Sequence, residues 1–213
     1  MNATARYISS SLVLVLLFSV PTLAAQSAAL WLKANGEDIR GESPVMSPGR
    51  EGTIEVLSLT MGVASPRDVA TGMATGRRTY DPIVITKRID KSSPLLAKAL
   101  THNEVVEGTI RFYRTKPDGT MSNYYTLRFS NGRVSSVRQY LPNVLDPATA
   151  SLPPYEEVSF VFQTITWIYE DGGIAYEDSM SGRSLGSTTS GEATTQPAPT
   201  APRTITRGIA KPQ

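Results

Sequence analysis

The sequence predicts a mainly β fold with one short α-helix, on three observations. Runs of β-branched and aromatic residues recur between turn residues from position 29 to 169. Only residues 88–100, RIDKSSPLLAKAL, space their apolar side chains as a helix does. Residues 156–169, EEVSFVFQTITWIY, are apolar on both alternating faces. Both faces therefore need a cover, so the sheet closes into a barrel, or a helix or second subunit packs on it.

The strands expected before the helix flank a long loop. A short apolar strand is expected at residues 29–33 and a longer one at 53–63. In the longer one, Ile54 and Val56 share one face, whereas the apolar residues from Leu57 onward share the other. This change of phase predicts a bulge or a bend. Residues 65–78 then form a loop whose length is typical of functional segments.

The helix is expected to follow a strand at residues 80–89. Ser93 is a candidate N-cap, and Pro94 would occupy the first helical position, where its missing N–H costs no hydrogen bond. The apolar stripe is made by Leu95, Leu96, Ala99 and Leu100. Because a helix of barely two turns is unstable alone, it must pack on the strands.

Four more strands are expected after the helix, at residues 105–115, 122–129, 133–140 and 156–169. The Asp-Gly pair in residues 116–121 predicts a hairpin turn. The sequence Ser-Asn-Gly at 130–132 predicts a second turn, and a proline-containing loop is expected at 141–154. The last of these strands would be the longest of the fold.

The two ends of the chain are predicted to lie outside the folded domain. Residues 1–25 read as a secretory signal: Arg6 precedes an apolar run at 12–20, and small residues follow it. That run is too short to span a bilayer, and an uncleaved anchor is the alternative. Residues 179–213 are rich in Ser, Thr, Pro and Gly, which predicts a disordered tail. One domain remains, at 26–178, in an exported protein of the periplasm or the extracellular space, without stable membrane insertion after signal cleavage.

Composition argues against catalysis and against nucleic-acid binding. The net charge is +2 without a basic cluster, so no nucleic acid is expected as a partner. There is no cysteine and one histidine, His102, which cannot build a metal site or a hydrolytic triad by itself. The adjacent acidic pairs at 156–157 and 170–171 are interpreted as solvated strand-end charge. We therefore predict no enzyme, no cofactor and no metal; an exported hydrolase with a hidden site is the least favoured alternative.

Two further groups of residues are candidates for binding. Arg77 and Arg78 end the long loop and could grip a phosphate or a carboxylate, although solvated charge or contact with an acidic partner surface is favoured. Trp167 and Tyr169 could form a sugar platform, although packing in a core or an interface suits a continuous apolar strand better.

Four segments in this order resemble the Hcp (haemolysin-coregulated protein) family, the tube proteins of type VI secretion systems. They are LKANGEDIRGES, TIEVLSLTMGV, ITKRIDKSSPLLAKAL and EEVSFVFQTITWIYE, and the resemblance covers residues 32–170. The most specific pieces are DIRGES at 38–43, TKRIDKSSPLL at 86–96 and ITWIYE at 165–170.

The resemblance implies a small β-barrel of two antiparallel sheets with one short helix on its flank. It also implies homohexameric rings that enclose a pore and stack into a tube, with effectors in the lumen and other type VI secretion components as partners. The loop at 65–78 would reach adjacent subunits or rings. The residues expected at interfaces are Asp38, Arg40, Glu42, Arg77, Arg78, Lys91, Leu95, Lys98, Trp167 and Tyr169. A monomeric periplasmic or secreted binding module on the same barrel is the alternative.

Overall fold

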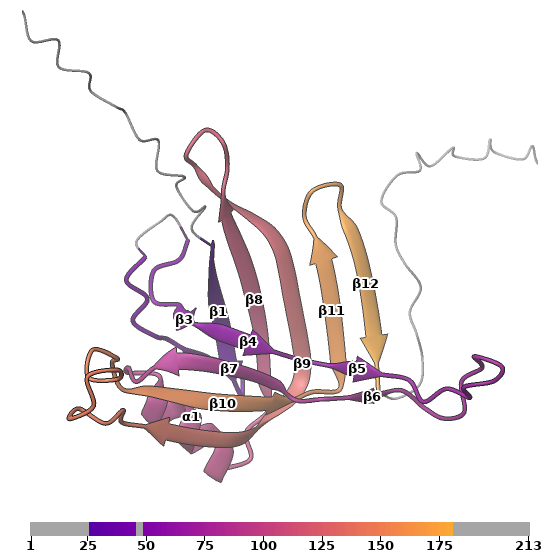
Figure 1. Cartoon of the computed structure of the whole chain (residues 1–213), viewed down its shortest axis with the longest axis horizontal. Coiled ribbons are helices and arrows are strands. Elements are labelled where there is room, and N and C mark those ends of the chain that lie inside the picture. Colours follow the sequence, from indigo (N-terminus) through magenta and orange to yellow (C-terminus); the bar gives the residue numbers. More distant parts are fainter. Residues whose placement is uncertain (1–25, 46–48, 181–213) are drawn as a thin grey trace, which may run out of the picture.

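The computed structural model describes residues 26–45 and 49–180, and the predicted signal and most of the predicted tail lie outside these ranges. The described chain is mainly β and antiparallel, and its strands lie in two sheets apart from one small two-stranded hairpin (Figure 1). The first sheet contains β1 (Gln26–Ala34), β2 (Glu37–Ile39), β3 (Ile54–Val56), β8 (Val106–Thr115), part of β9 (Met121–Tyr140), β11 (Thr164–Tyr169) and β12 (Ile174–Ser179). The second contains β4 (Ser58–Thr60), β7 (Ile83–Arg88), β10 (Tyr155–Val161) and the rest of β9.

Strand β9 belongs to both sheets. Its first part pairs with β8 and β11, and its residues from Arg133 to Tyr140 pair with β10. The turn predicted at residues 130–132 is therefore wrong, because the strand runs through this segment. Asn131 adopts a φ of 50°, which asparagine tolerates, and the chain bends there without reversing. A Cβ on Gly132 would lie 2.7 Å from the carbonyl oxygen of Val161, so only glycine allows this approach.

The single long strand predicted at 156–169 is also wrong, because it is two strands in different sheets. The chain leaves the second sheet after β10 and enters the first with β11. Phe162 and Ile165 are both buried although they are three positions apart, so the inward face changes between the two strands. The apolar residues on both faces of segment 156–169 are therefore explained by its crossing from the second sheet to the first.

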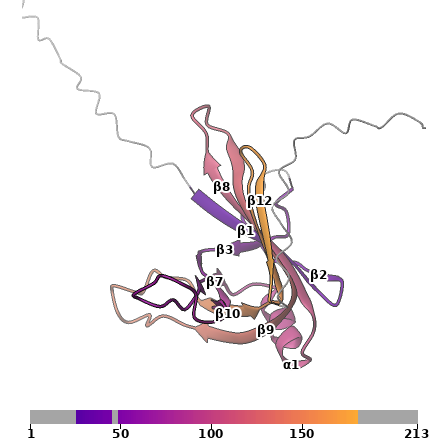
Figure 2. The same ribbon diagram turned by 90° about the vertical axis from the view of Figure 1, so that its right-hand side faces the viewer.

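The bend predicted inside residues 53–63 is confirmed. Strand β3 pairs with β1, and β4, which begins two residues after β3 ends, pairs with β7. The segment from 54 to 60 therefore passes from one sheet to the other, and the two sheets lie at a steep angle (Figure 2). Among the described residues the strand order is β2-β1-β8-β9-β10-β7-β4, and no closed β-barrel is seen.

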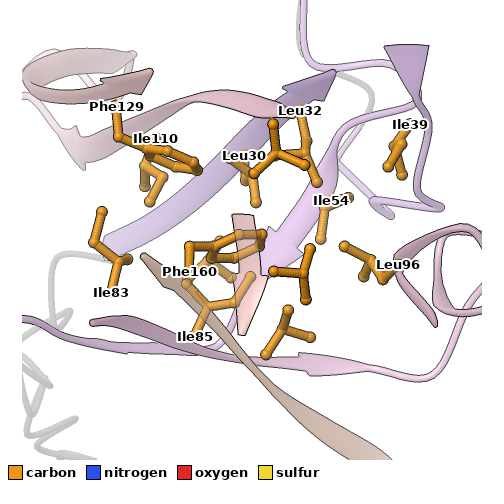
Figure 3. Close-up of a cluster of buried hydrophobic side chains, with 14 of the residues drawn as sticks. Leu30, Leu32, Ile39, Ile54, Ile83, Ile85, Leu96, Ile110, Phe129 and Phe160 are labelled. Carbon is orange, nitrogen blue, oxygen red and sulfur yellow. The ribbon is translucent and has the colours of Figure 1, made fainter. Parts of the chain in front are cut away.

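The predicted helix is confirmed as α1 (Ser93–Thr101), which packs against the sheets through the buried Leu96 and Ala99. Its N-cap is Ser92, one residue earlier than predicted. The hydrophobic core lies between the two sheets and includes Leu30, Ile85, Ile110 and Phe160 (Figure 3). No helix in the described ranges has the length and apolarity that crossing a bilayer requires.

The long loop at 65–78 is a hairpin that projects from the body (Figure 1). Its base is formed by β5 (Val63–Ala64) and β6 (Thr79–Tyr80), and we call residues 63–80 the arm. All residues from 63 to 79 are exposed. The loop predicted at 141–154 connects β9 and β10.

Candidate assembly site

A buried charge cluster lies where α1 begins against the second sheet. Lys87 and Glu156 are 1% and 0% exposed, and the Lys87 Nζ donates a 2.8 Å hydrogen bond to the Glu156 Oε1. The Ser93 hydroxyl donates to the same oxygen, and the Gln139 amide donates to Oε2 at 3.0 Å. Glu156 is therefore not the solvated strand-end charge that its position suggested, because the start of the helix covers it. Its carboxylate is fully satisfied inside the chain, as a structural ion pair requires.

Asp90 connects this cluster to the DIRGES segment. Its Oδ1 accepts a 2.8 Å hydrogen bond from Lys87, and its Oδ2 accepts one of 3.0 Å from the Glu42 backbone N–H. A Cβ on Gly41 would lie 2.9 Å from the Asp90 Oδ2, so glycine permits this contact. The DIRGES and TKRIDKSSPLL segments thus meet in space, and their residues hold β2, β7 and α1 together.

The Asp90 carboxyl remains ionised in this setting. Burial opposes its ionisation most strongly, but hydrogen bonds from Lys87, Ser92 and Glu42 outweigh that cost and lower its pKa. A carboxyl with a lowered folded-state pKa contributes stability above its unfolded value, and this contribution is lost as the pH falls through the folded value.

We therefore expect acid to weaken the fold through Asp90. The melting temperature should begin to fall steeply below about pH 4, the ordinary pKa of an aspartate. Scanning calorimetry from pH 7 to pH 3 would measure this, with Asp90→Asn for comparison. At pH 7 the variant should have a lower melting temperature than the unmodified chain, and its melting temperature should fall less as the pH is lowered. An equally steep loss in both proteins would show that Asp90 does not contribute.

The side chains of the DIRGES segment that were predicted at an interface are on the surface. Asp38 and Arg40 form an exposed ion pair of 3.9 Å, a geometry that contributes little stability. Both border a groove of about 660 Å³ beside β1, β2, β8, β9 and β11. Four acidic and three basic side chains line the groove, so its charge is nearly balanced. Such a lining suits a polar protein surface better than a highly charged small ligand.

The next three candidates lie on the exposed side of α1 and just before it, since Lys91 precedes the N-cap Ser92. Lys91 and Lys98 are exposed, and Leu95 is 40% exposed. Lys98 lies 3.2 Å from the Glu104 carboxylate just beyond the helix. Leu95 was expected in the apolar stripe with Leu96, but only Leu96 is buried. This leaves an apolar side chain on the outer face of the helix.

The arginines at the end of the arm contact the last described residues. Arg78 is paired with Asp178, and Arg77 donates a 3.3 Å hydrogen bond to the Met180 carbonyl. The Arg78 charge is thus matched within the chain, which leaves it poorly placed to bind a free phosphate.

Trp167 and Tyr169 are on β11 and differ in environment. The Trp167 ring stacks between Tyr80, at 6.4 Å, and Tyr176, at 5.7 Å between centroids. Tyr169 is 39% exposed. Trp167 is therefore a packing residue that joins the arm to β11 and β12, as expected for a residue in a core or an interface.

Sequence reasoning also missed Arg50, which is 1% exposed. Its guanidinium lies 4.2 Å from the centre of the Tyr113 ring, a cation–π contact. The spacing of apolar residues in the sequence cannot identify an arginine that is buried in a loop, because a loop has no regular spacing. Among the described residues no group of histidine and carboxylate side chains could hold a metal ion.

The family model described as "Type VI secretion system effector, Hcp" matches residues 31–169, which include the DIRGES and TKRIDKSSPLL segments. The chain belongs to the Hcp family. A relative named "Major exported protein", from Pseudomonas aeruginosa, is 37% identical over 131 residues, which are 61% of this chain and 76% of the relative.

Solved Hcp structures share the fold of this chain. The Hcp1 protein from the E. coli EAEC 042 pathovar is 32% identical, with a TM-score of 0.63 over 73% of this chain and 99% of that one. The secreted protein Hcp3 from Pseudomonas aeruginosa is 26% identical, with a TM-score of 0.58 over 73% and 98%. Hcp proteins are structural, secreted tube proteins of type VI secretion, which supports the prediction of a non-enzymatic tube subunit.

Proposed function

We propose that this Hcp chain is a non-enzymatic subunit of a homohexameric ring that stacks into a secretion tube. The observation that carries the proposal is the family match over residues 31–169. Other type VI secretion components and effectors in the lumen would be its partners. Residues 1–25 would be a signal that exports the chain, residues 26–178 the ring-forming domain and residues 179–213 an added tail.

Exposed apolar side chains favour assembly over a monomer. Val69 and Met73 of the arm are 102% and 70% exposed. In the loop between β9 and β10, Leu141 and Leu145 are 74% and 88% exposed. The two segments project from opposite sides of the body (Figure 1). A ring or filament of identical subunits uses two different patches on each subunit, and these segments supply two candidates.

The mass of the chain without its proposed signal, residues 26–213, tests the proposal. Light scattering on a sizing column should give about six times the mass of one chain. A monomer at high concentration would contradict the ring and would favour the monomeric binding module instead.

A double substitution, Val69→Ser with Met73→Ser, tests the arm as a contact. We expect it to lower the assembled fraction while the melting temperature of the subunit stays unchanged, because both side chains are exposed. The matched control is Ile174→Ser, which removes an apolar side chain that is 68% exposed on β12. Equal assembly in all three proteins would exclude the arm tip from the contact.

A further inference from the structure

One buried carboxylate ties the base of the arm to the end of β12. The Asp178 side chain is 1% exposed, and its two oxygens accept hydrogen bonds from the Arg78 guanidinium. The Tyr80 hydroxyl donates to the same carboxylate, and the Ser179 backbone N–H donates to its Oδ1 at 2.9 Å. Asp178 therefore joins two segments that are about 100 residues apart in the sequence.

Backbone contacts and ring contacts reinforce this joint. Arg77 bonds to the Met180 carbonyl and Arg78 to the Ser179 carbonyl, both at 3.3 Å. The Tyr80 ring stacks on Trp167 and meets Phe162 edge to face at 5.7 Å. The base of the arm thus rests on β11 and β12.

Beyond its base, the arm is held by its own contacts. Asp68 and Met73 are joined by a 2.9 Å backbone hydrogen bond, and the Arg67 guanidinium donates to the Gly72 carbonyl at 3.0 Å. The Asp68 carboxylate accepts hydrogen bonds from the Ala70 and Thr71 backbone N–H groups. These contacts shape the tip from within, whereas the contacts with Asp178, Ser179 and Met180 are all made by the base of the arm.

We propose that Asp178 acts as a clamp that sets the direction of the arm relative to β11 and β12. A fork of two hydrogen bonds between arginine and carboxylate fixes orientation as well as distance. The inference concerns the single chain and does not depend on ring formation.

Hydrogen exchange of the full chain, read by mass spectrometry, tests the clamp with Asp178→Asn. Asparagine keeps the shape of the side chain but removes its charge, which weakens the hydrogen bonds to Arg78. We expect the amides at the base of the arm, in β5 and β6, to exchange about tenfold faster, the size expected for losing a hydrogen bond to a charged group. The tip amides that the arm's own hydrogen bonds hold should change less. The amides of β8 and of the first part of β9 should be unaffected, which shows that the fold persists.

The matched control is Asp171→Asn. Asp171 pairs with Arg114 near the other end of the β11–β12 hairpin, and both side chains are largely exposed. This change should leave exchange in the arm unchanged. A second variant, Arg78→Lys, keeps the charge but removes the fork, and it should give a smaller acceleration than Asp178→Asn. Equal exchange of the arm in Asp178→Asn and Asp171→Asn would overturn the clamp.

Discussion

Lys87→Met should lower the free energy of unfolding by about 3–5 kcal/mol, because it removes one partner of a buried ion pair. The substitution keeps the volume of the side chain but removes the only cation hydrogen-bonded to Glu156 in the described structure. Glu156 is 0% exposed and would be left as a buried charge without a counter-ion. Asp90 would lose the same partner.

Urea unfolding followed by circular dichroism would measure the loss. The double variant Lys87→Met with Glu156→Leu should recover much of it, because apolar side chains of similar volume avoid the cost of burying charge. The matched control is Arg88→Gln. Arg88 is the neighbouring residue, and its pair with Glu55 is partly exposed, so a loss under about 1 kcal/mol is expected. A similarly small loss of unfolding free energy in Lys87→Met would mean that the ion pair between Lys87 and Glu156 does not stabilise the fold.

Gly41→Ala should cost about 1–3 kcal/mol of stability, the typical cost of forcing extra volume into a packed site. An added Cβ would lie 2.7 Å from the Thr53 carbonyl oxygen and 2.8 Å from the Ile54 Cα. Both are backbone atoms, so neither can rotate away. The same Cβ would press on the Asp90 carboxylate and disturb its contact with the Glu42 backbone.

Thermal unfolding of the two proteins would test this prediction. The control is Gly76→Ala in the arm, where an added Cβ would meet the Pro66 ring at an ordinary 3.6 Å. That change should alter stability by less than about 0.5 kcal/mol. Equal melting temperatures for Gly41→Ala and the unmodified chain would show that the DIRGES segment shifts to accommodate the added methyl group without any loss of stability.

The features that local patterns govern could be predicted from the sequence. Pro94 and the apolar spacing after it located α1, and the Asp-Gly pair located the β8–β9 turn, where Gly119 has a φ of 81°. The phase change after Val56 predicted the bend between β3 and β4. In each of these cases the controlling interactions lie within a few residues.

The errors arose where distant partners decide the structure. The Ser-Asn-Gly segment at 130–132 has the composition of a turn, yet β8, β11 and β10 hold the chain in one strand. Strand β12 was not predicted because its alternation is weak and it depends on pairing with β11. Glu156 lies 69 residues from Lys87, so its burial left no local signal. The candidate residues on the surface could be identified, but not the partners that they contact.

The sharing of β9 between the two sheets affects how the domain folds. One 20-residue strand carries hydrogen-bonded neighbours from both layers, so neither layer can melt without releasing part of the other. Unfolding of the body should therefore be a single all-or-none transition. Most of the pairings that complete it join residues far apart in the sequence, such as β7 with β10. Because such contacts form only after long loops have closed, refolding should take milliseconds to seconds, as in other antiparallel domains.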